Sequence, residues 1–209
     1  MVERSVRMGV NNLVKSELQF CRYLQDVFPR HIENFFLDFR CKLPTVHVQV
    51  KNTPDLPLIF LFLKDHSLLG FRQLIDIFGV DYPSKEKRFS IYYNLTSFKL
   101  NFRVMLYTTA SEFDFVYSLT SIFKGSNWLE REVWDMFGVF FANHADLRRI
   151  LTDYGFAGYP LRKDFPLSGF TEVFYDDEQK SVVSVDLEIS QEFRLQEGLS
   201  PWDVEVKDW

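Results

Sequence analysis

Several acid–base side chains of this sequence lie close together in the second half of the chain. His144 lies two positions before Asp146 and nine before Asp153, and a histidine held beside a carboxylate is a common general base. Glu130 and Asp135 form a second candidate pair, since two neighbouring carboxyl groups can divide the roles of acid and base. These residues favour, as one hypothesis, a small stand-alone enzyme that uses His144 and nearby carboxylates.

Two features of the same stretch argue against catalysis. Bulky aromatic residues surround the acid–base residues in sequence, and no serine or cysteine is placed there as a nucleophile in a strained turn. The chain also contains no G-x-G-x-x-G sequence and no Walker phosphate loop. We therefore predict no catalytic residue and no cofactor-binding residue in this chain.

The number of potential ligands limits metal chemistry as well. The chain has two cysteines, Cys21 and Cys41, and four histidines. Iron–sulfur clusters and structural zinc sites ordinarily need four ligands, and the histidines are not spaced to complete a set. We predict two reduced thiols, no metal site and no redox centre.

The acid–base residues are expected on and after one short helix over residues 128–137. Asn127 is a favourable N-cap, and Glu130 three positions later predicts a capping box. Gly138 can supply the left-handed residue that ends the helix.

Most of the surface of this helix is apolar. On a helical wheel, Arg131, Glu132 and Asp135 share one narrow polar arc. The rest of the wheel carries Leu129, Val133, Trp134, Met136 and Phe137. The helix is therefore expected to be buried on more than one side. Glu130 falls in the apolar arc, so it is either the capping carboxylate or a buried acid that needs an arginine or backbone donors.

An irregular arm follows the helix, interrupted by glycine and proline. It carries four basic residues, Arg148, Arg149, Arg162 and Lys163, among several acidic ones. Since the arm has no regular periodicity, we predict ion pairs that fix it in place. The alternative is four solvated charges, each worth under about 1 kcal/mol.

The order of residues in this stretch resembles the signature of a known family. The similar residues are Glu130-Arg131-Glu132, Trp134-Asp135-Met136-Phe137-Gly138, His144, Asp146-Leu147-Arg148-Arg149-Ile150 and Arg162-Lys163-Asp164-Phe165-Pro166. They resemble the thirty-kilodalton subunit of respiratory complex I, the NADH:ubiquinone oxidoreductase. Val80-Asp81-Tyr82-Pro83 resembles a second block of that family.

The resemblance implies a non-catalytic core subunit in the quinone-reducing module of the peripheral arm. Such a subunit contacts the large subunit that lines the quinone site, and it supports assembly and electron transfer from NADH to ubiquinone, coupled to proton translocation. It binds no cofactor itself, because FMN and the iron–sulfur clusters lie in other subunits. The implied location is peripheral, on the matrix side of the mitochondrial inner membrane or, alternatively, on the cytoplasmic face of a bacterial plasma membrane.

We predict that the signature residues form a partner interface or hold it in place. They are Glu130, Arg131, Glu132, Trp134, Asp135, Phe137, Gly138, His144, Asp146, Arg148, Arg149, Arg162, Lys163, Asp164 and Pro166, with Trp202 as a further anchor.

Composition predicts a globular domain followed by an acidic tail. Of the 209 residues, 46% are hydrophobic, which is enough for a buried core. Residues 1–170 hold 21 basic and 18 acidic side chains, whereas residues 171–209 hold 3 and 11. This acidic balance argues against a nucleic-acid partner, which needs a clustered basic surface.

No apolar run approaches the roughly twenty residues of a membrane span. The longest candidate, Leu56 to Leu63, is interrupted by Pro57 and followed by Lys64 and Asp65. As a surface helix it lacks the basic face of membrane-binding helices, so a membrane-surface protein is the least favoured hypothesis.

The remaining periodicities predict an α+β fold with helices packed on a mixed, largely antiparallel sheet. The expected helices are residues 13–28, 54–63 and 111–123, and the expected strands are 32–40, 46–50, 89–95 and 98–107, with 68–80 a strand or a short helix. We divide the chain into a globular domain (1–140), an irregular charged arm (141–170) and an extended acidic tail (171–209) that docks on partner subunits.

The tail contains one apolar stripe. Val183, Val185, Leu187 and Ile189 alternate with polar residues, as in a strand with one apolar face. The tail is either disordered or a strand laid along another protein. Its aliphatic content favours docking. Its excess of acidic residues directs it to a neighbouring, basic subunit, with Trp202 as a candidate anchor.

Overall fold

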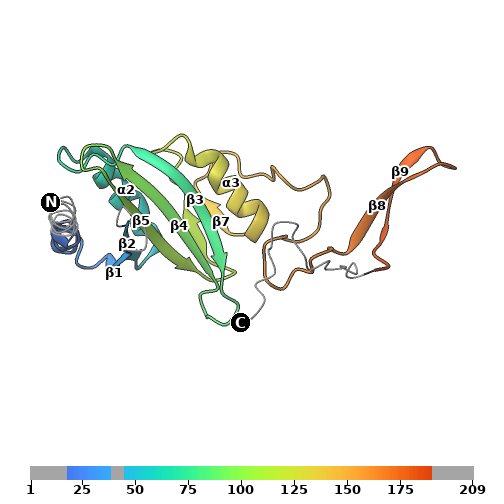
Figure 1. Ribbon diagram of the computed structural model, residues 1–209, viewed down its shortest axis with the longest axis horizontal. Coiled ribbons are helices and arrows are strands. Elements are labelled where there is room, and N and C mark those ends of the chain that lie inside the picture. Colours follow the sequence, from blue (N-terminus) through green and yellow to red (C-terminus); the bar gives the residue numbers. More distant parts are fainter. Residues whose placement is uncertain (1–17, 39–44, 190–209) are drawn as a thin grey trace, which may run out of the picture. The chain divides into compact units, whose positions relative to one another are not determined.

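The computed structural model describes residues 18–38 and 45–189 of the chain. The chain forms two compact units, Met1–Lys163 and Asp164–Trp209. The first unit contains a twisted sheet with its helices, and the second contains a two-stranded hairpin (Figure 1). Among the described residues, no helix is both long enough and apolar enough to cross a bilayer.

The sheet of the first unit has five strands in the order β1-β2-β5-β4-β3. Their bounds are β1 Ile32–Asp38, β2 Thr45–Val50, β3 Gln73–Asp81, β4 Phe89–Ser97 and β5 Phe102–Ala110. β2 pairs with β5 in parallel, and the other neighbouring strands are antiparallel. This confirms the predicted mixed, largely antiparallel sheet, and it settles the open choice for residues 68–80 in favour of a strand.

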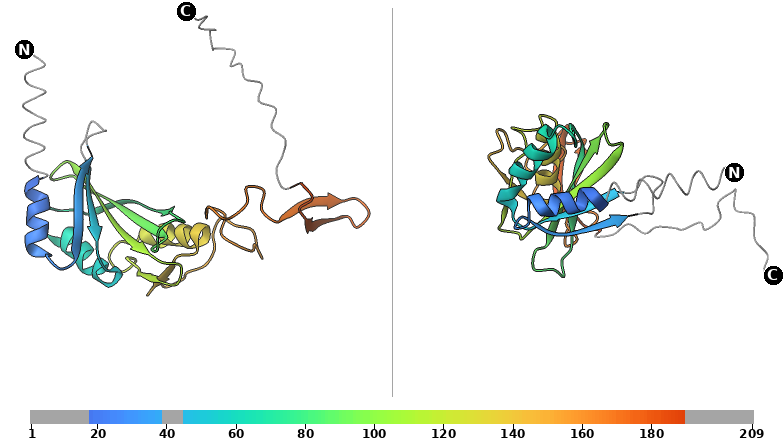
Figure 2. Two further views of the ribbon diagram at one scale, coloured as in Figure 1. Left: turned by 90° about the horizontal axis from the view of Figure 1, so that it is seen from below. Right: turned by 90° about the vertical axis from the view of Figure 1, so that its left-hand side faces the viewer.

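The helices cover one face of the sheet (Figure 2). Alternation along β4 and β5 directs apolar side chains to that face, where they are buried. Residues 18–27 are helical, and from them Phe20 packs edge-on against Phe102 of β5 at 5.2 Å between ring centroids. From α2 (Leu56–Asp65), which follows a short 3-10 turn at Thr53–Asp55, Phe60 packs against Tyr93 of β4 at 5.1 Å.

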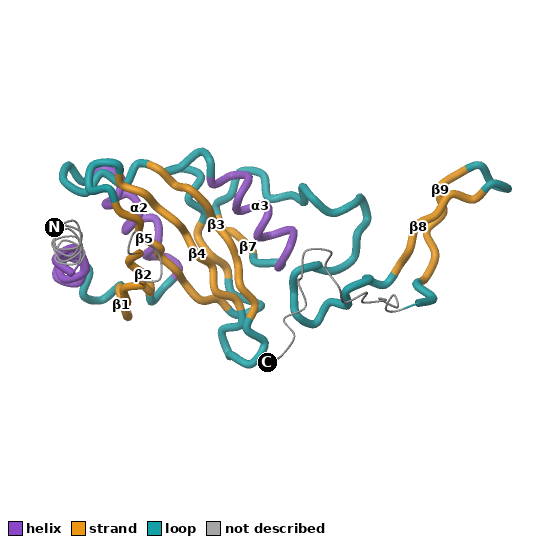
Figure 3. Tube along the Cα trace, viewed as in Figure 1, coloured by secondary structure: helices purple, strands orange, loops and turns teal. Residues whose placement is uncertain are grey.

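The third helix, α3 (Ser126–Phe137), packs on β3 at the far edge of the sheet (Figure 3). Gly79 makes the close approach possible, since a Cβ there would lie 2.9 Å from the Phe137 ring. Phe137 also meets Phe89 of β4 edge-on at 6.4 Å. After α3, β7 (Phe140–Ala142) pairs in parallel with β6 (Phe115–Tyr117).

The predicted helix over residues 111–123 is wrong. The segment forms a turn, then β6, then further turns up to Gly125. The backbone N–H of Ser111 donates to Asp114 Oδ2 at 2.9 Å, which closes a local turn where the helix was expected to begin. The apolar residues behind this prediction, Val116, Leu119 and Phe123, are nevertheless core residues, because all three side chains are buried.

The second unit contains β8 (Thr171–Asp176) and β9 (Ser181–Asp186), which pair antiparallel as a hairpin. The predicted strand around Val183 therefore exists as β9. It pairs with β8 of the same chain, a pairing that was not predicted from the sequence. The N–H of Leu187 extends the pairing by donating to the carbonyl of Phe170 at 3.0 Å. Trp202, the predicted anchor, lies outside the described residues.

Candidate functional site

Two signature residues on α3, Arg131 and Asp135, bind the irregular arm that follows it. We call α3 together with residues 138–163 the α3–arm junction. The arm has no helix and only the short strand β7, so most of its backbone groups need partners from side chains, turns or water. Polar side chains of α3 and β3 supply many of these partners.

Asp135 binds the middle of the arm. Its side chain is fully buried, and Oδ2 accepts from the backbone N–H groups of Ile150, Leu151 and Thr152 at 3.2, 2.7 and 3.0 Å. Oδ1 accepts from the Thr152 hydroxyl at 2.7 Å, and Arg149 Nη1 lies 3.5 Å from the same oxygen. Burial opposes ionisation, but the hydrogen bonds from Thr152, Leu151 and Ile150 outweigh it and lower the pKa of Asp135.

Glu130 is the buried acid of the two predicted alternatives, and the predicted capping box is wrong. α3 begins at Ser126 after Gly125 and has no side-chain cap bond. Glu130 is fully buried: Oε2 accepts from the Ser118 hydroxyl at 2.5 Å, and Oε1 accepts from the Leu119 N–H at 2.7 Å. Burial raises the pKa of Glu130 to about 6, and the bonds from Ser118 and Leu119 limit the increase.

Both ring nitrogens of His144 are already engaged. Nδ1 accepts from the backbone N–H of Asp146 at 3.1 Å, and Nε2 lies 3.2 Å from the Asn127 carbonyl, to which it donates. The side chain is fully buried, and Nε2 is 3.9 Å from Glu130 Oε2, which is too far for a hydrogen bond. His144 therefore has no free lone pair with which to act as a general base, and the geometry counts against the small-enzyme hypothesis.

Gly138 and Arg162 join the end of α3 to the end of the arm. Gly138 has φ 78°, and a Cβ there would lie 2.6 Å from the Tyr159 ring and 2.7 Å from Arg162 Nη2. Arg162 Nε donates to the Phe137 carbonyl at 2.7 Å, and its guanidinium pairs with Glu112. Glycine is required here for its left-handed backbone and for its missing side chain.

Tyr159 lies between two guanidinium groups. Arg162 is 4.5 Å and Arg149 5.0 Å from its ring centroid, both within cation–π range. Trp134 meets the same ring edge-on at 5.9 Å. Arg149 also donates to the Gly158 carbonyl at 2.9 Å. These contacts hold Tyr159 of the arm against Trp134 of α3.

Asp81, at the end of β3, anchors the last residues of the arm. Arg88 binds it with two hydrogen bonds, Nε to Oδ1 at 2.7 Å and Nη2 to Oδ2 at 2.8 Å. The backbone N–H of Lys163 donates to the same Oδ2 at 2.8 Å. The second sequence block of the resemblance, at Val80-Asp81-Tyr82-Pro83, thus meets the first block in space.

The other predicted residues differ in burial. Arg131 is buried and donates to the Arg148 carbonyl at 3.1 Å, whereas the Arg148 side chain is exposed and pairs with Asp146 at 3.0 Å. Glu132 is exposed. Asp164 and Pro166 belong to the second unit, where the Pro166 carbonyl accepts from Gly169.

Sequence reasoning missed several residues that hold the junction. They are Asp81, Arg88, Glu112, Ser118, Thr152 and Tyr159. Asp81 could have been found, since it lies in the second resembling block. Ser118 and Thr152 carry no local signal, because their partners on α3 are far away in sequence.

Large apolar side chains remain exposed around the junction. Trp128, Phe140, Leu151, Tyr154 and Leu161 are each more than half exposed. They belong to the α3–arm junction, where many polar groups are hydrogen-bonded within the chain. Several large apolar side chains exposed on one ordered segment are typical of surfaces that bind another protein.

Comparison with known proteins identifies similar chains. Residues 48–171 match the family described as "Respiratory-chain NADH dehydrogenase, 30 Kd subunit". "NADH dehydrogenase (ubiquinone) iron-sulfur protein 3" of Beta trigyna is 57% identical over 152 residues, which cover 73% of this chain and 79% of that protein. "NADH-ubiquinone oxidoreductase subunit 9" of Reclinomonas americana is 49% identical over 177 residues, which cover 85% of this chain and 84% of that protein.

One solved structure shares the fold at lower identity. A chain of the membrane-bound sulfane sulfur reductase, an archaeal respiratory membrane complex, superposes with a TM-score of 0.58 at 24% identity. The match covers 72% of this chain and 85% of the archaeal chain.

The bonds to Asp135 give a first testable prediction. Asp135→Asn places an amide N–H₂ among backbone and hydroxyl donors and removes the charge, so the free energy of unfolding should fall by about 3 kcal/mol. Chemical denaturation of the full chain measures this. Asp146→Asn is the control, because its pair with Arg148 is exposed and should change stability by less than about 1 kcal/mol. Equal small effects of both substitutions would contradict the role given to Asp135.

The raised pKa of Glu130 gives a second prediction. The folded state binds this proton more tightly than the unfolded state, so stability falls as pH rises from about 4.5 to about 6. Glu130→Gln cannot titrate. Its stability relative to the wild type should therefore increase by about 2 kcal/mol between pH 4.5 and pH 7. Denaturation curves across this range test it, with exposed Glu132→Gln as the control; a difference that stays constant with pH would refute the assignment.

Proposed function

Because the chain belongs to the family of the 30 kDa subunit of respiratory-chain NADH dehydrogenase, we propose that its own residues hold an interface and catalyse no step. The chain is then a core subunit of the peripheral arm, in the quinone-reducing module of NADH:ubiquinone oxidoreductase. The complex transfers electrons from NADH to ubiquinone and translocates protons. This chain supports that reaction by its position in the assembly.

One observation carries the proposal. At the α3–arm junction, the side chains best suited to acid–base chemistry, Asp135, Glu130 and His144, bind groups of the chain itself. The side chains that face outward there include the large apolar residues Trp128 and Leu151. A surface of this kind is suited to a protein partner. We assign it to the large subunit that lines the quinone site.

Some relatives are named as iron–sulfur proteins, which raises the question whether this chain has the ligands of an iron–sulfur cluster. The whole sequence has two cysteines, and of these Cys21 is buried in the helical segment 18–27. A cluster is ordinarily held by four cysteine thiolates. These residues do not fit a cluster, and we assign FMN and the iron–sulfur clusters to other subunits.

The proposed location follows from the relatives. Their names are those of subunits of NADH dehydrogenase (ubiquinone) and NADH-ubiquinone oxidoreductase. We propose a peripheral position on the matrix side of the mitochondrial inner membrane.

The hairpin of the second unit offers a further docking surface. Val173, Phe174, Tyr175 and Val182 are each at least half exposed, and an isolated two-stranded hairpin is marginally stable in water. Residues 171–209 also carry a large excess of acidic groups. We propose that this segment docks on a neighbouring, basic subunit.

Charge reversal at Arg162 tests the role of the junction. Arg162→Glu removes the bond to the Phe137 carbonyl and places a carboxylate beside Glu112, so the amount of assembled complex should fall several-fold. NADH:ubiquinone turnover per assembled complex should stay near the wild-type value. Arg103→Glu, at an exposed position of β5 outside the junction, is the matched control. Lost turnover in a fully assembled complex would instead give Arg162 a role in electron transfer.

Truncation after Phe170 tests the docking segment. The shortened chain should keep the unfolding transition of the first unit but fail to co-purify with the complex. Phe174→Asp should weaken co-purification through loss of one exposed apolar contact, whereas Phe174→Leu, which keeps an apolar side chain and the charge of the segment, should not. Undiminished recovery of the truncated chain would show that residues 171–209 are not needed for docking.

A further inference from the structure

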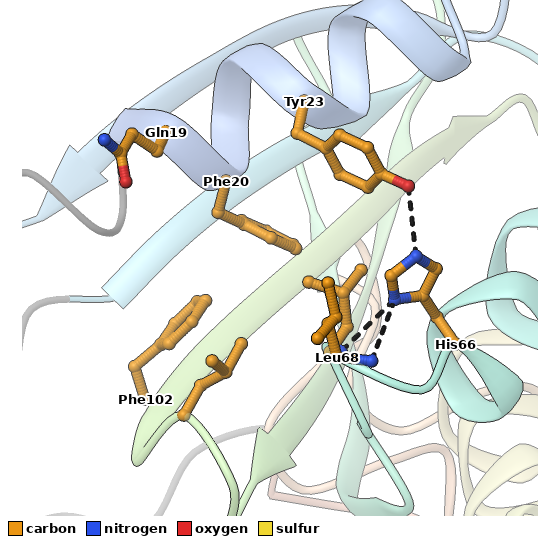
Figure 4. A pocket seen from close by; sticks show the side chains of 8 residues that line it. Gln19, Phe20, Tyr23, His66, Leu68 and Phe102 are labelled. Atoms are coloured by element: carbon orange, nitrogen blue, oxygen red, sulfur yellow. Dashed lines mark hydrogen bonds between the residues drawn. The ribbon is translucent and has the colours of Figure 1, made fainter.

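A groove lies on the helix-covered side of the sheet, between the segment 18–27 and the loops that follow α2 and β4. Its volume is about 380 Å³. Its lining is mostly apolar and includes Phe20, Tyr23, His66, Leu68, Leu100 and Phe102 (Figure 4). Residues of the α3–arm junction do not appear in its lining.

Two aromatic rings, Phe20 and Phe102, form part of the lining of the groove. Phe71 packs against both of them, and the three ring centroids lie 5.2 to 5.6 Å apart. All three are buried. The wall is also fixed, because the Ser97 hydroxyl donates to the Leu69 carbonyl at 2.5 Å and accepts from the Leu100 N–H at 3.2 Å. The groove is therefore formed before any ligand enters.

One wall carries an oriented hydrogen-bond donor. His66 Nδ1 accepts from the backbone N–H groups of Leu68 and Leu69, each at 3.3 Å, so the ring proton lies on Nε2. Nε2 is 3.0 Å from the Tyr23 hydroxyl and donates to it. The hydroxyl proton of Tyr23 then points away from His66 and can be donated to a ligand.

The groove also has two aliphatic lining residues that reach the surface. Leu68 is 65% exposed, and Leu100 is 36% exposed.

We propose that the groove binds a fatty acyl chain that carries a carbonyl oxygen. Ligand sites typically measure 300 to 1,000 Å³ and combine an apolar lining with a few oriented polar groups. The acyl methylenes would lie against the aromatic lining residues, and the carbonyl oxygen would accept from Tyr23. Because the groove is open at the surface, the rest of the molecule can extend past Leu68 and Leu100. A free fatty acid and a phospholipid share this chemistry.

Titration calorimetry of the full chain tests the site with two probes, lauric acid and lauroyl lysophosphatidylcholine, both below their micelle concentrations. Binding of lauric acid alone identifies a free acid as the source, binding of the lysolipid alone identifies a phospholipid, and binding of both supports the shared acyl group. Binding of neither overturns the proposal.

Two kinds of variant locate the binding. Leu100→Trp fills the mouth of the groove and should abolish binding. If this variant shows an altered unfolding transition, Leu68→Trp, at a more exposed position, replaces it and should also abolish binding. Tyr23→Phe removes the donor and should weaken binding about two- to tenfold. Tyr154→Phe is the matched control, since Tyr154 is fully exposed on the arm. Binding that these groove variants leave unchanged overturns the assignment.

Crosslinking separates a lipid from a protein occupant. A benzophenone amino acid at position 100, in the assembled complex, should form adducts with extractable acyl lipid. Adducts with another polypeptide would show that a partner side chain fills the groove and would overturn the proposal.

Discussion

The buried carboxylate of Asp135 is the interaction on which the shape of the arm depends. Three consecutive backbone N–H groups, from Ile150 to Thr152, donate to one of its oxygens. An irregular segment cannot satisfy these groups through a helix or a sheet, and leaving them buried without acceptors would cost about 1–3 kcal/mol each. One ionised acceptor replaces a regular element and so allows a long loop to have a single conformation.

The same kind of internal hydrogen bonding is why we propose no catalytic role for Glu130 and His144, although their residue types are suited to acid–base chemistry. Glu130 lies within a cluster of hydroxyl and backbone donors, and His144 uses both ring nitrogens to fix the turn that follows β7. A general base needs a free lone pair in reach of a substrate proton. Residue types alone cannot distinguish a catalytic role from a structural one. An acid near a histidine gives the same sequence pattern whether its carboxylate binds a substrate or the backbone.

The elements that depend on a local pattern of apolar and polar residues could be predicted from the sequence. Alternation along β4 and β5 and the periodicity of α3 were sufficient to predict the sheet and the helix, because each pattern reflects one buried face. The predicted capping box is wrong because the Glu130 carboxylate binds Ser118, which lies outside α3, and not the N-terminus of the helix. The contacts of Asp135 could not be predicted, because its main partners are backbone groups that every residue possesses. Asp81 and Arg88 lie on paired strands, but only the structure shows that they also bind Lys163.

The rigidity of the arm has a consequence for association. Binding costs free energy for every side chain and loop that must be ordered at the interface. Leu151 and Tyr154 project from a backbone that Asp135 and Asp153 already hold through hydrogen bonds, so little backbone ordering remains when a partner buries them. In the assembly that we propose, the polar contacts inside the junction contribute indirectly. They keep the exposed apolar side chains in a fixed arrangement, ready for contact with a partner.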